Sequence, residues 1–327
     1  MKTSMASQSP SQSTKAHAFV ELQRRIIEIE SPICLGIDPS HKTLPRFLYD
    51  DARRQGASEE LALEEALVAF ASALLRAANG LAAVCKPQIA YFEAFGIPGL
   101  KAFQRILKLA HEAGFLAIAD VKRGDIGSTS KAYADAFLGE TQGFKSKRQR
   151  AFEADFVTLH PYMSDDSVLP FLETALEYGR GCFVLARTSN PSAANFQSLR
   201  LDDGRQVMDV IADHIERWGE SSRDRQYGLS AVGAVVGATC PEEARRMRQR
   251  MPHSFFLIPG YGAQGGVASD AVAGFREDGL GAVVNASRSI ANAYQKHGLA
   301  IEDFERAARL EMIEMREKIG DALRHHV

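Results

Sequence analysis

Eight short apolar runs recur along the 327-residue chain, separated by stretches with helical periodicity. The runs are continuously apolar, which is typical of parallel strands covered on both faces. Strand–helix alternation predicts an α/β fold, and eight repeats in a chain of this length favour a (β/α)8 TIM barrel over an open sheet. We predict the eight strands at residues 33–38, 82–86, 115–121, 155–160, 182–187, 230–237, 254–259 and 282–286.

Both ends of the chain extend beyond these repeats. Residues 18–30 predict a helix that caps the base of the barrel. Apolar side chains recur every three or four residues near the C-terminus, so we expect an amphipathic helix at 301–325. Residues 1–16 are rich in Ser and Gln, which predicts a disordered tail. These expectations leave a single barrel domain at 17–327.

Three connecting segments carry more specific predictions. Residues 267–276 and 289–296 predict amphipathic helices after the seventh and eighth strands. The basic segment at 140–150 follows a helix and precedes a strand, so we expect it at the base of the barrel, away from the catalytic loops. We interpret it as a solvated loop.

Composition excludes several classes of function. A net charge of −2 gives no reason to expect nucleic acid or an anionic membrane as a partner. No apolar run approaches the roughly 18–20 residues that cross a bilayer. Cys34, Cys85, Cys182 and Cys240 are far apart, each in or beside an apolar run. This pattern predicts reduced thiols and a cytoplasmic location, with neither a disulfide framework nor a zinc site.

Charged residues gather at the end of the third predicted strand. Asp120 and Lys122 are two residues apart, so a regular strand would direct both side chains to one face. Asp125 follows where the strand gives way to a loop. Charges on the inward face of a buried strand are costly unless they are paired or functional. The cluster therefore predicts a site at this end of the barrel.

Other predicted strands also end in polar residues. Barrel enzymes place catalytic groups at the carboxyl ends of their strands. Strand 1 ends in Asp38, strand 2 in Lys86 and strand 4 in His160, and strand 5 leads into Ser189. We therefore expect these side chains to meet at one rim.

The last two strand ends indicate a phosphate site. The loops after strands 7 and 8 are the usual phosphate site of this fold. Glycines in the loop at 260–266 allow backbone N–H groups to approach an anion, and Gln264 offers an amide donor. Arg288, after strand 8, offers a fork of donors to phosphate oxygens. The alternative is a tight glycine turn, with Arg288 paired to a surface carboxylate.

These residues together resemble a known family. The pattern Asp120-x-Lys122-x-x-Asp125-Ile126, with Thr129 four residues after Asp125, is similar to the signature of orotidine 5′-phosphate decarboxylases. The surrounding sequence KRGDIGSTSKAYA resembles a longer bacterial subgroup of that family. Further similar segments follow in order at nearly every strand end: LGIDPS at 35–40, KPQ at 86–88, HPY at 160–162, RTSNP at 187–191 and PGYGAQGG at 259–266.

The resemblance implies a carboxy-lyase that converts orotidine 5′-monophosphate to UMP and CO2 in pyrimidine nucleotide synthesis, without metal or organic cofactor. It also implies a homodimer with shared sites, in which Asp125 and Thr129 reach into the neighbour's site. The catalytic network would comprise Lys86, Asp120, Lys122 and Asp125. The substrate contacts would be Asp38 and Lys86 to ribose, Ser189 to the pyrimidine, Gln264 and Arg288 to phosphate, together with Ile126 and Thr129.

The chemistry agrees with these implied roles. Loss of CO2 from C6 leaves a carbanion without a conventional electron sink, so preorganised charges must stabilise it. Lys122 would stabilise that carbanion and then protonate it, with Asp120 and Asp125 keeping the ammonium charged. Asp120 would repel the departing carboxylate by about 4 kcal/mol at 4 Å, a fraction of the roughly 23 kcal/mol that the largest common rate enhancements require. This decarboxylation needs no base, so we interpret His160 as a hydrogen-bonded structural histidine and Tyr162 as a packing residue.

Three other functions remain open at this stage. A Mg²⁺-dependent phosphosugar lyase or synthase on the same barrel would need a further acidic ligand, whereas strand 2 ends in Lys86. A Schiff-base aldolase would want Lys122 unpaired in an apolar pocket, and the flanking aspartates oppose this. A nucleotide-binding barrel without catalysis would be indicated by a missing member of the charged network, and none is missing.

Overall fold

The computed structural model describes residues 16–144, 147–262 and 265–325. Eight parallel strands close into a barrel in the order β1-β10-β9-β8-β7-β6-β3-β2, which confirms the predicted (β/α)8 fold. All eight predicted strands are present, most of them shorter at one or both ends than expected. They are β1 (Ile33–Ile37), β2 (Val84–Pro87), β3 (Leu116–Arg123), β6 (Phe156–Leu159), β7 (Gly181–Arg187), β8 (Val232–Val236), β9 (Phe256–Ile258) and β10 (Ala282–Ala286).

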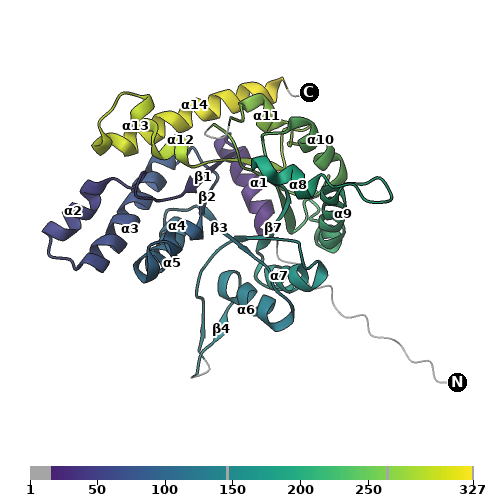
Figure 1. Cartoon of the computed structure of the whole chain (residues 1–327), viewed down its shortest axis with the longest axis horizontal. Coiled ribbons are helices and arrows are strands. Elements are labelled where there is room, and N and C mark those ends of the chain that lie inside the picture. Colours follow the sequence, from purple (N-terminus) through teal and green to yellow (C-terminus); the bar gives the residue numbers. More distant parts are fainter. Residues whose placement is uncertain (1–15, 145–146, 263–264, 326–327) are drawn as a thin grey trace.

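Helices surround the strands (Figure 1). Their apolar side chains pack against the outer side of the barrel. The main helices are α3 (Glu59–Ala78), α5 (Gly96–Glu112), α6 (Gly127–Phe137), α7 (Asp165–Tyr178), α9 (Val207–Gly219), α10 (Pro241–Arg250) and α11 (Ala268–Val272). Three short helices were not predicted, and each lies in a loop after a strand. They are α2 (Arg46–Arg54), α4 (Ile89–Glu93) and α8 (Ala194–Gln197).

The N-terminal helix α1 (Ala18–Ile29) closes the base of the barrel. Phe19 of this helix is fully buried, and its ring lies 4.7 Å from that of Phe156 and 4.9 Å from that of Phe183. Both partners lie near the starts of their strands, so the aromatic cluster fills the base. Just before the helix, His17 is buried and its Nε2 donates to the Leu229 carbonyl at 3.0 Å.

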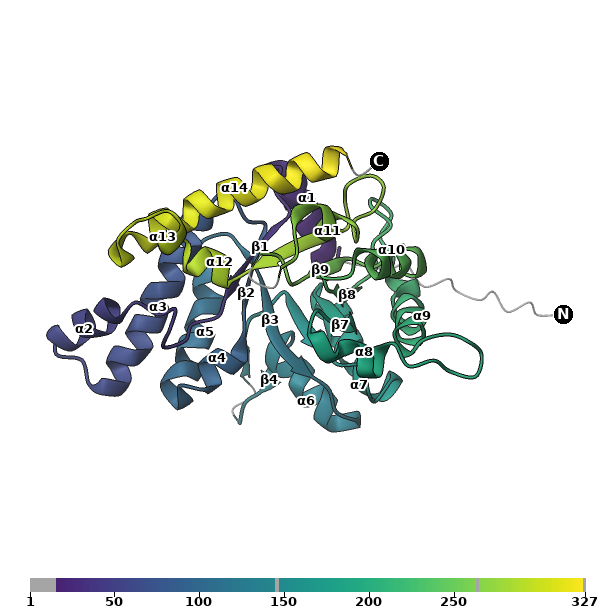
Figure 2. The ribbon, with the colours of Figure 1, turned by 45° about the horizontal axis from the view of Figure 1, so that its top comes forward.

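The C-terminal helix α14 (Phe304–Arg324) lies along one side of the barrel, beside α11, α12 (Arg288–Ala291) and α13 (Ala293–Lys296), as Figures 1 and 2 show. Phe304 stacks on Phe70 of α3 with ring centroids 5.6 Å apart. The apolar stripe that the sequence predicted therefore packs against helices of the barrel. Its buried side chains are Phe304, Ala307, Ala308, Met312, Met315 and Ile319.

Two of the predicted helices and the basic segment differ from expectation. Helix α11 ends at Val272, well before residue 276, and the helix expected at 289–296 is divided at Asn292. Asn292 has φ −102° and ψ 13°, which interrupts the helical geometry. The segment at 140–150 is not simply a loop, because residues 141–142 pair with 148–149 in an antiparallel sheet. The predicted tail lies almost entirely outside the described residues.

Among the helices of the described residues, none is long and apolar enough to cross a membrane.

Candidate active site

The end of β3 carries a β-bulge, so Asp120 and Lys122 do not follow regular strand alternation, although their side chains meet as a shared face predicts. The pairing of β3 with β6 shifts register between Ala119 and Arg123. At the bulge, the backbone N–H groups of Val121 and Lys122 both donate to the Thr158 hydroxyl, at 3.0 and 2.9 Å. Lys122 has φ +45°, a left-handed conformation that is strained for a residue with a side chain. Bulges often redirect a side chain beside an active site.

The bulge nevertheless brings the predicted charges together around Asp120. Its Oδ2 accepts from Lys86 Nζ at 2.7 Å and from Gln88 Nε2 at 2.9 Å. Its Oδ1 accepts from Lys122 Nζ at 2.6 Å and from the Thr158 hydroxyl at 2.9 Å. Because a carboxylate offers about four acceptor positions, these donors fix its orientation completely.

Burial and charge compete in setting the protonation of this group. Asp120 is 5% exposed, and burial alone would raise its pKa. The two ammonium groups of Lys86 and Lys122 outweigh burial and hold the pKa of Asp120 well below its ordinary value. For Lys86, burial lowers the pKa, but Asp120 and Asp38 outweigh it and raise the pKa above its ordinary value. Asp120 and Lys86 therefore carry full charges at neutral pH.

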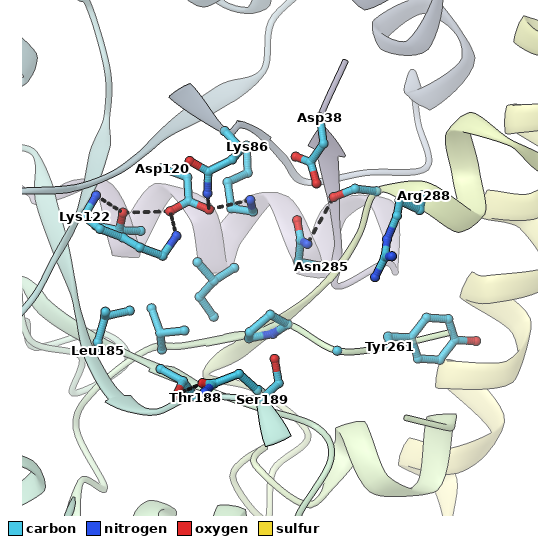
Figure 3. Close-up of a pocket in the computed structure, with 18 of the residues that line it drawn as sticks. Asp38, Lys86, Asp120, Lys122, Leu185, Thr188, Ser189, Tyr261, Asn285 and Arg288 are labelled. Carbon is cyan, nitrogen blue, oxygen red and sulfur yellow. Dashed lines mark hydrogen bonds and ion pairs between the residues drawn. The ribbon is translucent and has the colours of Figure 1, made fainter. Parts of the chain in front are cut away.

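These groups open into a cavity of about 590 Å³ at the carboxyl ends of the strands. Figure 3 shows Lys86, Asp120 and Lys122 along one side of it, with Leu185, Thr188 and Ser189 along the opposite side. Its apolar lining comes from Leu185, Val235 and Leu257. The cavity thus combines charged groups, an apolar wall and room for a small ligand, since binding pockets commonly measure ~300–1,000 Å³.

Three of the residues predicted to bind only substrate also line this cavity: Asp38, Ser189 and Arg288. Asn285 and Ser287, at the end of β10 and just after it, line the cavity as well. The buried Oδ1 of Asp38 has no hydrogen-bond partner among the described residues. A buried carboxylate oxygen without a donor is costly, so this atom suits a ligand hydroxyl.

Three predicted site residues do not line their own cavity. Asp125 Oδ1 accepts from the backbone N–H of Ile126 at 2.7 Å, and neither residue appears in the cavity wall. Ile126 is 57% exposed, and Thr129 is also exposed on the first turns of α6. One chain therefore does not bring the whole predicted set together. Gln264 lies outside the described residues.

The glycine-rich loop after β9 uses several of its own amides. Gly262 N–H donates to the Gly266 carbonyl at 2.9 Å, and Gly266 N–H donates back to the Gly260 carbonyl at 3.1 Å. Gly265 N–H donates to the Gly262 carbonyl at 2.9 Å. The expectation that these N–H groups face an anion is not met in this conformation. Arg288 is exposed and lies in the cavity wall, where its guanidinium is within reach of an anionic ligand.

Sequence reasoning missed two residues that hold the network. Gln88 donates to Asp120 while its Oε1 accepts from Ala90 N–H and so caps α4. Thr158 is a polar residue inside the apolar strand β6, and this unusual position was the signal in the sequence that could have identified it.

The interpretation of His160 as a hydrogen-bonded histidine was wrong in one respect, because its buried Nδ1 has no partner among the described residues. Tyr162 is 80% exposed, so it does not pack within this chain.

The fold and this cavity define the class of protein: the chain is a (β/α)8-barrel enzyme whose charged cavity suits an anionic substrate. It belongs to the Orotidine 5′-phosphate decarboxylase / HUMPS family, whose model matches residues 31–302. The chain is 39% identical to an orotidine 5′-phosphate decarboxylase of Clostridium perfringens, covering 91% of this chain and 96% of the relative. A relative of the same name from Clostridium novyi is 37% identical, over 88% of this chain and 93% of the relative.

A solved structure supports the same family assignment. The chain superposes on the OMP decarboxylase of Leishmania donovani with a TM-score of 0.71 and 30% identity, covering 93% of this chain and 98% of that one. The predicted family and the predicted carboxy-lyase activity are therefore confirmed. The Mg²⁺-dependent and non-catalytic alternatives are not favoured.

Proposed function

We propose that the chain decarboxylates orotidine 5′-monophosphate to UMP and CO2, with Lys122 as the proton donor to C6 and without a metal or organic cofactor. The observation that carries this proposal is the chain of contacts from Lys86 through Asp120 to Lys122 at one wall of the cavity. As CO2 leaves, negative charge develops at C6, and a preorganised ammonium stabilises it without reorganisation. The same ammonium then transfers a proton to that carbon.

Asp120 supports this chemistry in two ways. Its carboxylate holds Lys122 Nζ at 2.6 Å, which fixes the position of the ammonium. Its negative charge would also face the carboxylate of the substrate and disfavour that group in the ground state. A divalent cation is disfavoured at Asp120, because Lys86 lies 2.7 Å away and the acceptor positions of the carboxylate are already filled.

The remaining cavity residues would orient the substrate. Asp38 has a buried oxygen that lacks a donor, so it and Lys86 would hold the ribose hydroxyls. Ser189 lies across the cavity and would contact the pyrimidine edge. Arg288 begins α12, just after β10, and lies in the cavity wall, so it would hold the phosphate. Gln264 would be a second donor, as the sequence predicts. Phosphate binding energy would then serve to orient the reacting ring.

We also propose a homodimer with shared sites, in which Asp125, Ile126 and Thr129 complete the partner's cavity. The proposal rests on their position at the same rim but outside their own cavity. Exposed apolar side chains follow the two neighbouring strands β3 and β6: Ile126 is 57% exposed, Tyr162 80% and Met163 39%. Large exposed apolar groups clustered on one face are typical of protein interfaces.

A cytoplasmic location fits the cysteines, none of which is in a disulfide and three of which are buried. We propose that residues 17–327 act as one domain, because α14 packs against the barrel helices.

The test of the activity is the absorbance change of orotidine 5′-monophosphate with purified protein, with and without a chelator. We expect turnover that the chelator does not affect and that Lys122→Ala abolishes. Lys108→Ala is the matched control, because Lys108 is an exposed lysine of α5 whose ion pair with Glu112 spans 3.8 Å. Wild-type protein without turnover would refute the activity, and loss of turnover with the chelator would favour the Mg²⁺-dependent alternative.

Subunit mixing tests the shared site. In a mixture of Lys122→Ala and Asp125→Asn proteins, each heterodimer would hold one cavity with both residues intact. Random exchange should therefore restore about a quarter of wild-type activity. Two inactive parents that exchange subunits yet stay inactive would show that Asp125 serves its own chain.

A further inference from the structure

We propose that Thr158 is a positioning residue of this enzyme, which holds Asp120 and Lys122 in their reactive arrangement through its hydroxyl. The inference rests on the proposed function of those two residues. Thr158 lies in β6 between Val157 and Leu159 and is 1% exposed. A hydroxyl in such a place is costly unless its hydrogen bonds are made.

The hydrogen bonds that this hydroxyl can donate and accept determine where its proton points. It lies 3.0 Å from the N–H nitrogen of Val121, 2.9 Å from that of Lys122 and 2.9 Å from Asp120 Oδ1. A hydroxyl has one proton to donate and two acceptor lone pairs. The two backbone groups can only donate, so they occupy both lone pairs. The single proton of Thr158 must therefore point to the carboxylate of Asp120.

One side chain thus joins the backbone of the bulge to the charged network. The two N–H groups that converge on Thr158 belong to the bulge, where Lys122 adopts φ +45°. Strained backbone persists only where its surroundings hold it in place. Without the oxygen of Thr158, two N–H groups at the bulge lose their acceptor, and Lys122 is free to relax toward regular strand geometry.

Such relaxation would move the reactive ammonium. Lys122 Nζ and the Thr158 hydroxyl meet at the same oxygen of Asp120, so loss of Thr158 releases both the backbone of Lys122 and the orientation of its partner. A displacement of about 1 Å in a reacting group can cost about 100-fold in rate. Substrate affinity should change little, because Asp38, Ser189 and Arg288 lie on other strand ends.

The experiment compares Thr158→Val with Thr158→Ser. Valine keeps the shape of the side chain and removes the hydroxyl, whereas serine keeps the hydroxyl. We expect Thr158→Val to lower kcat about 100-fold, with KM and the affinity for UMP within about threefold of wild type, and Thr158→Ser to keep kcat within about threefold. Thr174→Val is the matched control, since Thr174 is also buried and donates to the Pro170 carbonyl at 3.0 Å, away from the cavity.

The outcomes separate this inference from the proposed function. A folded Thr158→Val protein with kcat within threefold of wild type overturns the inference, as does a serine variant as impaired as the valine variant. If Thr158→Val does not fold, Thr158→Ser against Thr158→Ala repeats the test, because both lack the methyl group and differ only in the hydroxyl. Wild-type protein without turnover would instead refute the decarboxylase itself.

Discussion

Replacing Lys122 by glycine should remove activity and yet give a more stable protein than replacing it by alanine. Both substitutions delete the ammonium and its contact with Asp120, so these losses cancel in the comparison. Both keep the N–H that donates to Thr158. They differ in the residue that must adopt φ +45°. Alanine keeps the steric conflict of the left-handed conformation, whereas glycine removes it.

The difference in stability between the glycine and alanine variants is the balance of two opposing free energies. A residue with a Cβ pays roughly 1–2 kcal/mol for the left-handed conformation. Glycine gains more entropy in the unfolded chain, which costs about 0.4–1 kcal/mol relative to alanine. The balance favours glycine by about 0.5–1 kcal/mol. For a chain of this length that corresponds to about 1 °C in Tm, because the unfolding entropy scales with length.

Calorimetry and urea unfolding of the two variants side by side are the appropriate assay, with orotidine 5′-monophosphate turnover measured on the same preparations. The expected result is two proteins without measurable turnover, with the glycine variant the more stable. An alanine variant as stable as the glycine variant, or more so, would show that the bulge carries no strain at Lys122. Turnover in either variant would show that Lys122 is not the proton donor.

Three further predictions concern other parts of the molecule. Arg288→Ala should raise KM for orotidine 5′-monophosphate roughly 10- to 100-fold in steady-state kinetics, because it removes charge-assisted bonds to the phosphate. Burial lowers the pKa of His17 below its ordinary value, so the unfolded chain takes up a proton first as pH falls below about 6.5 and folding loses stability there. His17→Gln should therefore lose less stability between pH 7 and pH 5 in urea unfolding. Arg248→Met should lower stability by about 3–5 kcal/mol in thermal unfolding, because Arg248 donates to four buried carbonyls near the starts of β9 and β10.

The barrel could be predicted because its strands are mostly apolar, with polar residues chiefly near their carboxyl ends, and because helices follow them regularly. The burial of every residue in β1, β2, β6, β8, β9 and β10 explains why the apolar runs were continuous. The short helices after strands were not predictable in the same way. Helix α4, for example, has five residues and begins where Gln88 caps Ala90, so no periodic pattern develops within it.

The sequence predicted several of the residues that line the site, but only part of the geometry in which they meet. Asp38, Lys86, Asp120 and Arg288 were expected at one rim because each follows or ends a strand, and the closed barrel brings those ends together. The bulge was not expected, because the acceptor of its N–H groups lies in the neighbouring strand. That acceptor is Thr158, whose partners lie 36 to 38 residues away along the chain. A pattern read along one strand does not contain this information.

The two ends of the barrel explain why the strained end is tolerated. At the base, Phe19 packs among aromatic rings and Arg248 satisfies buried carbonyls, so stability there does not depend on the cavity. At the rim, two ammonium groups share one carboxylate, and Lys122 holds a costly backbone conformation. The left-handed backbone of Lys122 costs stability, and it places an ammonium where a carbanion would form. Substitutions that relax the rim should therefore trade activity for stability, whereas substitutions at the base should lower stability and leave kcat unchanged.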